Sequence, residues 1–215
     1  MKTRFLVFSA GLIVALTGLM VYCWPQLPAQ VPIHWAADGT VNGYGARASL
    51  WLFGPGMLAA LTWLFCQLPT ISPQRYGIAG FAATYYYLCG VALTLFAYVQ
   101  ALVLLAAMQR GWPMQLALPA GLNVMLILLG NPMGKVQRNF FMGIRTPWTL
   151  SNEVVWYATH RLAARLMVLS GLLGLIALTL HAPFWLQSVL MLGWAAVAVL
   201  YSYVRYQQEL KGTSL

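Results

Sequence analysis

Few side chains in this sequence could do acid–base chemistry, and two of them, Glu153 and His160, lie seven residues apart. If the surrounding segment is helical, Glu153, Tyr157, Arg161 and Arg165 recur every four residues and form one stripe, and His160 falls on the same face. A carboxylate and an imidazole on one face could act as general acid and base. No metalloprotease, serine-hydrolase, phosphate-loop or paired-cysteine motif accompanies them. The pattern is more typical of an ion-paired structural face or a contact with anionic lipid, so we predict no catalytic site.

A second pair of titratable side chains, His34 and Asp38, lies in the stretch VPIHWAADGTVNGYGAR. Apolar residues alternate with others over its first five positions, which predicts a short extended strand. Asp38–Gly39 and Asn42–Gly43 each favour a turn because both dipeptides accept positive φ. We expect a small hairpin or looped lid in which His34 is hydrogen-bonded, although the spacing does not require His34 to meet Asp38.

The composition is that of a bilayer protein. The 215 residues are 61% hydrophobic and only 7% charged, whereas about a quarter of the residues of a soluble domain are charged. Twelve Lys and Arg oppose three acids, but they stand in the gaps between apolar runs and not on a polar surface that could bind nucleic acid. The three cysteines lie at unrelated depths of the apolar runs and lack metal-ligand spacing. We therefore expect no disulfide, no metal site and no cofactor.

Six apolar runs are long enough to cross a membrane as helices. They cover residues 5–24, 48–68, 78–108, 116–132, 163–181 and 184–204. Six spans place both termini on one side, together with ten cations: Lys2, Arg4, Arg75, Lys135, Arg138, Arg145, Arg161, Arg165, Arg205 and Lys211. Only Arg47 and Arg110 fall on the other side. Because cytoplasmic loops are enriched in Lys and Arg, we predict an all-α, six-helix transmembrane bundle with both termini in the cytoplasm.

The spans divide the chain into four parts. Residues 1–47 hold the first transmembrane helix and the extracytoplasmic hairpin, and residues 48–132 hold helices two to four. Residues 133–161 form a cytoplasmic loop with an amphipathic helix. Residues 162–215 hold helices five and six and a short cytoplasmic tail.

The 133–161 segment carries its own local signals. Pro147 disfavours a helical conformation in the residue before it, so the RTPW stretch should be extended. Thr149 or Ser151 should cap a new helix, with Glu153 in its first turn. The side of this helix that carries Val154, Val155 and Ala158 is apolar. We expect the helix to lie at the headgroup level before the chain turns into the fifth span.

The stretch RNFFMGIRTPWTLSNEVVWYATHRLAARLMVLSG resembles the hallmark of the SdpI family. These are six-span bacterial membrane proteins named for the immunity protein of a sporulation-delaying peptide toxin. The matching residues are Asn139, Gly143, Ile144, Arg145, Thr146, Pro147, Trp148, Thr149, Leu150, Trp156, Thr159, His160 and Arg161. The hairpin stretch is similar to the family's N-terminal extracytoplasmic motif at Pro32, His34, Gly39, Gly43, Tyr44 and Gly45. Two motifs in the expected order extend the resemblance over nearly the whole chain.

This resemblance implies an inner-membrane protein that protects its cell from a secreted, membrane-active peptide. For the type member it also implies signalling, in which a soluble repressor is held at the membrane when toxin is present. The implied partners are the lipid bilayer, a peptide toxin and a repressor at the cytoplasmic face, and no nucleic acid.

On this interpretation, the 133–161 segment is a rigid platform that captures a partner, and Asn139 and Thr159 satisfy backbone groups in it. A segment that merely seals the inner mouth of the bundle is the structural alternative. The candidate platform residues are Asn139, Gly143, Arg145, Thr146, Pro147, Trp148, Thr149, Glu153, Trp156, Thr159, His160 and Arg161. The candidate ligand-facing residues of the hairpin are Pro32, His34, Trp35, Asp38, Gly39, Gly43, Tyr44 and Gly45.

Two other functions stay open as alternatives. A small-molecule or lipid transporter is one, although ion-coupled carriers usually place an ionisable residue within the membrane, and no span has one near its centre. The other is a membrane-embedded enzyme, which would depend on Glu153 and His160.

Overall fold

The computed structural model describes residues 1–36, 38–73, 76–110 and 113–212. Arg75, which the sequence analysis counts among the cytoplasmic cations, lies outside the described residues. Within them, six helices are long and apolar enough to cross a membrane: Lys2–Gln26, Ser49–Ile71, Ala79–Ala107, Met114–Met133, Glu153–Thr179 and Phe184–Gly212. The prediction of an all-α, six-helix membrane protein is confirmed. The side on which the termini lie stays a prediction.

The chain divides into two compact units. The first comprises Met1–Cys66 and Cys89–Leu122, and the second comprises Gln67–Leu88 and Asn123–Leu215. Three helices contribute residues to both units: α3 (Met57–Ile71), α4 (Ala82–Ala107) and α5 (Met114–Met133).

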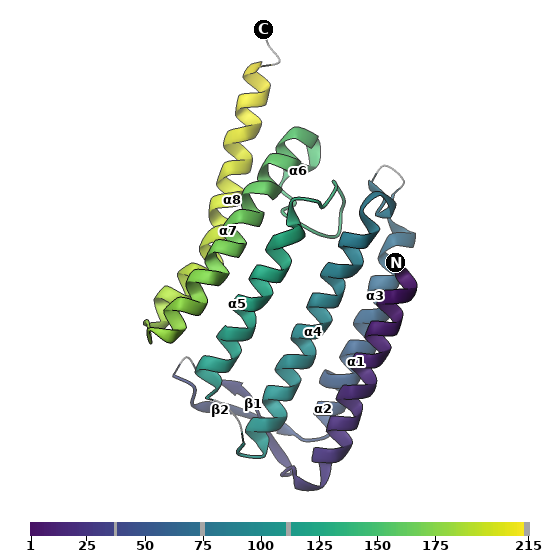
Figure 1. Ribbon diagram of the computed structural model, residues 1–215, viewed down its shortest axis with the longest axis vertical. Helices are drawn as coiled ribbons and strands as arrows, with labels where there is room; N and C mark the ends of the chain where they lie inside the picture. The colour runs from purple at the N-terminus through teal and green to yellow at the C-terminus, as the bar shows by residue number, and fades with distance from the viewer. Residues whose placement is uncertain (37, 74–75, 111–112, 213–215) are drawn as a thin grey trace. The chain divides into compact units, whose positions relative to one another are not determined.

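The first unit holds a β-hairpin between two spanning helices (Figure 1). Helix α1 (Lys2–Cys23) and the 3₁₀ turn η1 (Trp24–Gln26) precede the strands β1 (Gln30–Trp35) and β2 (Val41–Ala46), which pair antiparallel. The next helix begins as α2 (Ser49–Trp51), continues as the π-helix η2 (Leu52–Gly56) around Pro55, and becomes α3.

One of the two turn predictions for the hairpin is correct. Asp38–Gly39 forms the turn, since Gly39 has a φ of 85° and its N–H donates to the carbonyl of Ala36 at 2.9 Å. The prediction for Asn42–Gly43 is wrong, because both residues lie in β2 and Gly43 pairs with His34. A Cβ added at Gly43 would lie 2.9 Å from the Cβ of His34, so the glycine serves a close cross-strand approach and not a turn.

Apolar packing anchors the hairpin within the first unit. Val31 is fully buried in a cluster with Met20 of α1, Leu50 of α2 and Leu104 of α4. Next to this cluster, the amide of Gln100 donates to the backbone carbonyl of Leu50 at 3.3 Å, beside the π-helix. The hairpin is therefore packed against three helical elements of its own unit.

The second unit contains η4 (Ala79–Phe81), the short helix α6 (Pro147–Ser151), α7 (Glu153–Thr179) and α8 (Phe184–Gly212). Helices α7 and α8 run side by side, and α6 lies at the start of α7 (Figure 1). The expectation of a separate interfacial helix before the fifth span is wrong, because α7 is one continuous helix of 27 residues. The absence of Gly and Pro between Glu153 and Ser170 leaves nothing to break it.

Two glycines bring α5 against α7. A Cβ at Gly171 would lie 2.6 Å from the backbone oxygen of Asn123, and one at Gly174 would lie 2.0 Å from the Asn123 side chain. Asn123 and Gln187 of α8 are both buried, with their amides 3.4 Å apart, and Gln187 donates to the carbonyl of Gly174 at 3.0 Å. Small residues and paired amides are typical contacts between membrane helices.

Candidate functional site

The side chain of Asn139 organises the loop between α5 and α6. Its Oδ1 accepts from the backbone N–H groups of Phe141 at 2.7 Å and Met142 at 2.8 Å. Its Nδ2 donates to the carbonyls of Gln137 at 2.8 Å and Met142 at 3.2 Å. Asn139 is fully buried, so it supplies partners that water would otherwise supply. The expectation that Asn139 satisfies backbone groups is confirmed.

His160 fixes the next part of the loop. Its Nε2 accepts from the backbone N–H of Ile144 at 3.0 Å, and its Nδ1 lies 2.8 Å from the carbonyl of Trp156. A carbonyl can only accept, so Nδ1 carries the proton and the ring is neutral. The ring stacks on Trp156 at a centroid distance of 4.0 Å. His160 is therefore a fully buried clamp with both nitrogens engaged.

Gly143 is the residue that lets the loop approach this ring. Its φ is 103°, a conformation that side chains disfavour. A Cβ built on Gly143 would lie 2.2 Å from Nε2 of His160. Backbone conformation and close approach thus both require glycine at this position.

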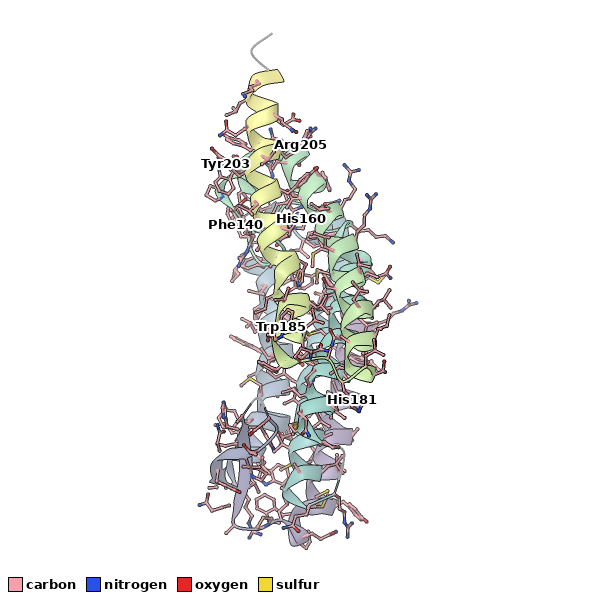
Figure 2. The ribbon with its side chains drawn as sticks, turned by 90° about the vertical axis from the view of Figure 1, so that its left-hand side faces the viewer. Phe140, His160, His181, Trp185, Tyr203 and Arg205 are labelled. Carbon is pink, nitrogen blue, oxygen red and sulfur yellow. The ribbon has the colours of Figure 1, made fainter. Side chains whose placement is uncertain are left out.

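Trp156 holds the opposite end of the same loop. Its indole N–H donates to the carbonyl of Val136 at 2.7 Å, and both residues are fully buried. Since Trp156 and His160 are one turn apart on α7, one short stretch of helix ties down both Val136 and Ile144. Figure 2 shows Phe140, His160 and Tyr203 toward one end of the α7–α8 pair, with His181 toward the other.

The predicted stripe of Glu153 with His160 is wrong. Glu153 and Arg161 are exposed, whereas His160 is fully buried beside Trp156 and Thr159. Residues spaced four apart advance by about 40° per step around a helix, so the stripe winds away from His160 toward solvent or lipid. Glu153 instead lies 3.9 Å from Arg138. The acid–base hypothesis thus gains no support from the geometry.

Thr159 does not play the role expected of it. Its hydroxyl is buried and has no hydrogen-bond partner among the described residues. Unlike Asn139, it satisfies no backbone group of the loop. Its position on the buried face of α7 explains why Thr159 is buried. It does not explain why a residue with a hydroxyl group stands there.

The RTPW stretch combines an extended residue with a helix start. Thr146 is extended, as expected, with a φ of −81° and a ψ of 160°. Pro147 then begins α6, which corrects the expectation that the whole stretch is extended, because proline suits the first position of a helix. Thr146 and Thr149 form a reciprocal capping box, and the hydroxyl of Thr149 donates to the carbonyl of Ile144 at 2.7 Å.

The cap of α7 is Asn152 and neither Thr149 nor Ser151, which the sequence analysis suggested. The side chain of Asn152 accepts from the N–H groups of Val154 at 2.8 Å and Val155 at 3.2 Å. Glu153 does lie in the first turn, where the helix dipole favours an acid.

Contacts with α8 complete the packing of the 133–161 segment. The hydroxyls of Thr146 and Ser202 are 3.2 Å apart, and the ring of Trp148 meets that of Tyr203 edge-on at 5.1 Å. Arg145 is exposed and donates to the carbonyl of Phe140. The segment is thus braced against two spanning helices and presents Arg145 outward.

Sequence reasoning missed several residues of this arrangement: Arg138, Asn152, Val136 and Ser202. Arg138 donates to the carbonyl of Leu150 at 3.2 Å and lies 5.5 Å from the ring centroid of Tyr76. Asn152 could have been found, since it directly precedes the first-turn acid. Val136 and Ser202 carry no local signal, because their contacts depend on tertiary packing.

The hairpin presents a mixed set of side chains. Among the predicted ligand-facing residues, Pro32 is buried, Trp35, Gly39, Gly43 and Gly45 are half-buried, and His34, Asp38 and Tyr44 are exposed. Nδ1 of His34 lies 2.5 Å from Oδ1 of Asn42, while Asp38 accepts from the hydroxyl of Thr40 at 2.7 Å. His34 and Asp38 therefore have separate partners.

The hydrogen bonds of Thr40 hold the pKa of the Asp38 carboxyl below its ordinary value. A lowered folded-state pKa stabilises the turn above the unfolded-state pKa. That contribution is lost as the pH falls through the folded-state pKa of Asp38.

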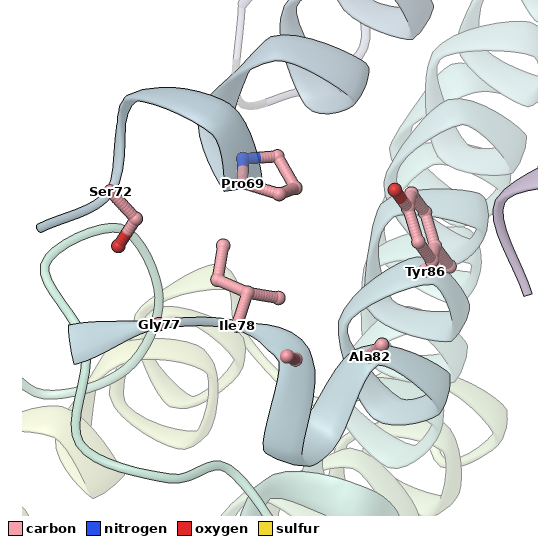
Figure 3. A pocket seen from close by; sticks show the side chains of 7 residues that line it. Pro69, Ser72, Gly77, Ile78, Ala82 and Tyr86 are labelled. Carbon is pink, nitrogen blue, oxygen red and sulfur yellow. The ribbon is translucent and has the colours of Figure 1, made fainter. Parts of the chain in front are cut away.

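A pocket of about 320 Å³ lies between the end of α3 and the start of α4 (Figure 3). Its lining residues are Pro69, Ser72, Gly77, Ile78, Ala79, Ala82 and Tyr86. They include two hydroxyl groups but no carboxylate or imidazole, so the pocket offers no acid–base pair. Among the described residues, no three His, Cys, Asp or Glu side chains gather where they could hold a metal ion.

Comparison with known proteins finds similar families for two parts of the chain. A family model described as the SdpI/YfhL protein family matches residues 135–202, which contain the loop, α6, α7 and most of α8. The stretch from the loop to α8 is therefore similar to the SdpI/YfhL family. A model described as a domain of unknown function (DUF1648) matches residues 11–58, which contain the hairpin.

The likeness to one SdpI protein extends over nearly the full length. Immunity protein SdpI of Bacillus subtilis (strain 168) is 26% identical over 200 residues, which cover 92% of each chain. No solved structure matches this chain. The likeness to the SdpI/YfhL family and the six apolar helices together identify a multi-pass bacterial membrane protein.

Proposed function

We propose that this chain is an immunity protein that protects its cell against a secreted, membrane-active peptide toxin. The observation that carries the proposal is the alignment with Immunity protein SdpI, which covers 92% of both chains and includes both motifs. The family models cover the hairpin and residues 135–152, two stretches that lie between spanning helices. The proposed function depends on these two parts.

The proposed topology has both termini in the cytoplasm. The excess of Lys and Arg on the side of the termini supports it. The hairpin would then lie outside, where a secreted peptide arrives, with His34, Asp38 and Tyr44 exposed to it. The platform would lie inside, with Arg145 exposed to the cytoplasm.

The finer proposal is that the platform captures a soluble repressor when the toxin is present. Its support is the rigid construction around Asn139 and His160, which holds Arg145 and Trp148 in one arrangement. A platform of this kind would keep the same internal structure with toxin bound and without it. Toxin binding would then act by uncovering or reorienting it. Transport of a small molecule or lipid is kept as the alternative.

The test is survival of a toxin-sensitive bacterium challenged with a membrane-depolarising peptide of the sporulation-delaying type. Cells that express the wild type should survive concentrations that kill cells with empty vector. Arg145→Ala, at matched membrane abundance, should lose repressor capture, read as the membrane location of a fluorescently tagged soluble repressor. Death of wild-type cells at the concentration that kills the vector control contradicts immunity. Capture by Arg145→Ala equal to that of the wild type contradicts the platform.

A further inference from the structure

Three exposed cations of the second unit have no carboxylate partner. Lys135, Arg161 and Arg165 are all exposed, and none forms an ion pair among the described residues. The chain has only three acids. Two of them, Glu153 and Glu209, form ion pairs with arginines other than these three.

The third acid, Asp38, belongs to the hairpin of the first unit, where it binds Thr40. Among the described residues of the second unit, ion pairing therefore leaves these cations without counter-charge. Two like charges spaced four residues apart on a helix, as Arg161 and Arg165 are, repel one another unless an anion lies between them.

The cations lie where α7 passes the C-terminal end of α5. Helices α5 and α7 are side by side (Figure 1), and a Cβ at Gly130 would lie 2.7 Å from the Cβ of Met167. A Cβ at Gly134 would lie 3.3 Å from Cγ of Arg161. The stem of Arg161 thus crosses the end of α5, next to Lys135.

Below the cations, both helices present exposed apolar faces. On α7, the face that starts at Arg165 continues through residues three or four apart, each about half exposed: Leu169 52%, Leu172 48% and Ile176 54%. On α5, Val124 and Leu128 are exposed at 43% and 39% on the face that ends at Lys135. The exposed apolar faces of α5 and α7 therefore both adjoin the cations that have no carboxylate partner.

We propose that Lys135, Arg161 and Arg165 bind the phosphate of an anionic phospholipid whose acyl chains lie along the exposed faces of α5 and α7. Guanidinium groups match phosphate oxygens in geometry and charge. Basic clusters at the cytoplasmic end of transmembrane helices attract anionic headgroups. The exposed apolar faces favour a lipid over free phosphate, since a soluble anion has no acyl chains to pack against them. This inference goes beyond the proposed immunity function.

The test is native mass spectrometry of the purified full chain in detergent, titrated with phosphatidylglycerol or with phosphatidylcholine of the same acyl chains. Phosphatidylglycerol should bind more tightly, and Arg161→Gln/Arg165→Gln should weaken it about tenfold. Arg161→Lys/Arg165→Lys keeps the charges and should retain most of the binding. Lys2→Gln/Arg4→Gln, the matched control, removes two exposed cations from α1 and should leave the binding unchanged.

Three results would overturn the proposal. Equal binding of the two lipids would show that the negative charge of the headgroup does not determine binding. A glutamine variant that binds phosphatidylglycerol as the wild type does would remove the role of these arginines. Displacement of phosphatidylglycerol by millimolar inorganic phosphate would assign the site to a soluble anion. The readout is independent of toxin protection, so failure here leaves the immunity proposal intact.

Discussion

Replacement of Gly143 by alanine is expected to abolish protection and to lower the thermal stability of the purified protein. The backbone of Gly143 has a φ of 103°, and the new Cβ would lie 2.2 Å from Nε2 of His160. Strain of this kind and overpacking each cost about 1–3 kcal/mol. Relief by movement would break the hydrogen bond from Ile144 to His160, which spans only 3.0 Å. The loop would lose its attachment to α7.

The matched control is Gly11→Ala on α1, where an added Cβ meets nothing within 4 Å. The same chemical change there should leave survival unchanged and, because alanine favours helix, raise stability by about 0.5–1 kcal/mol. Survival and thermal unfolding would be measured for both variants at equal membrane abundance. Full protection by Gly143→Ala would show that the conformation of this loop is irrelevant to function.

Asn139→Ala should have the second largest effect. The change removes hydrogen bonds with Phe141, Met142 and Gln137 in a fully buried position. Each lost bond is worth about 1 kcal/mol, and more where a group is left buried without a partner. We expect the free energy of unfolding to fall by about 2–4 kcal/mol. Hydrogen exchange of the amides of residues 141–142 should rise more than that of α8.

Asn131→Ala serves as the comparison, because Asn131 is exposed at the end of α5. It should shift stability by no more than about 0.5 kcal/mol. Asn139→Asp tests the hydrogen bonds that the amide oxygen accepts separately from those that the amide nitrogen donates. It can still accept from the N–H groups of Phe141 and Met142 but cannot donate to the carbonyls, so its stability should fall between alanine and wild type. Equal unfolding temperatures for Asn139→Ala and Asn131→Ala would contradict the account of the loop.

The sequence predicts the spanning helices well because their signal is physical and local. A run of about 20 apolar residues has few options other than a membrane helix. The boundaries are less certain where polar residues extend a helix beyond the apolar run. The fifth span starts at Glu153 and not near residue 163, since Asn152 caps the helix there and no Gly or Pro interrupts the residues between them.

The site was predictable only in part. Asn139, Thr146 and the Asp38–Gly39 turn act on near neighbours, so their roles follow from residue type and short spacing. The face that His160 occupies could not be derived in the same way. A spacing of seven residues places His160 on nearly the same side of the helix as Glu153. Only the packing against Trp156 determines that the His160 side is buried.

The amides within the membrane illustrate a further limit. Asn123 and Gln187 do not ionise, so charge does not single them out among the spans. Their pairing depends on the approach of α5 to α7 at Gly171 and Gly174, which is a property of the folded bundle. Sequence spacing alone does not bring residues 64 positions apart into contact.

The most direct test of immunity is the membrane potential of a sensitive bacterium, followed with a voltage-sensitive dye while a depolarising peptide of the sporulation-delaying type is added. Cells that express this chain should keep their potential at peptide concentrations that depolarise cells with empty vector, and cells with Gly143→Ala should depolarise as the vector control does. Equal loss of potential in wild-type and vector cells, at verified membrane abundance of the protein, would contradict the proposed function.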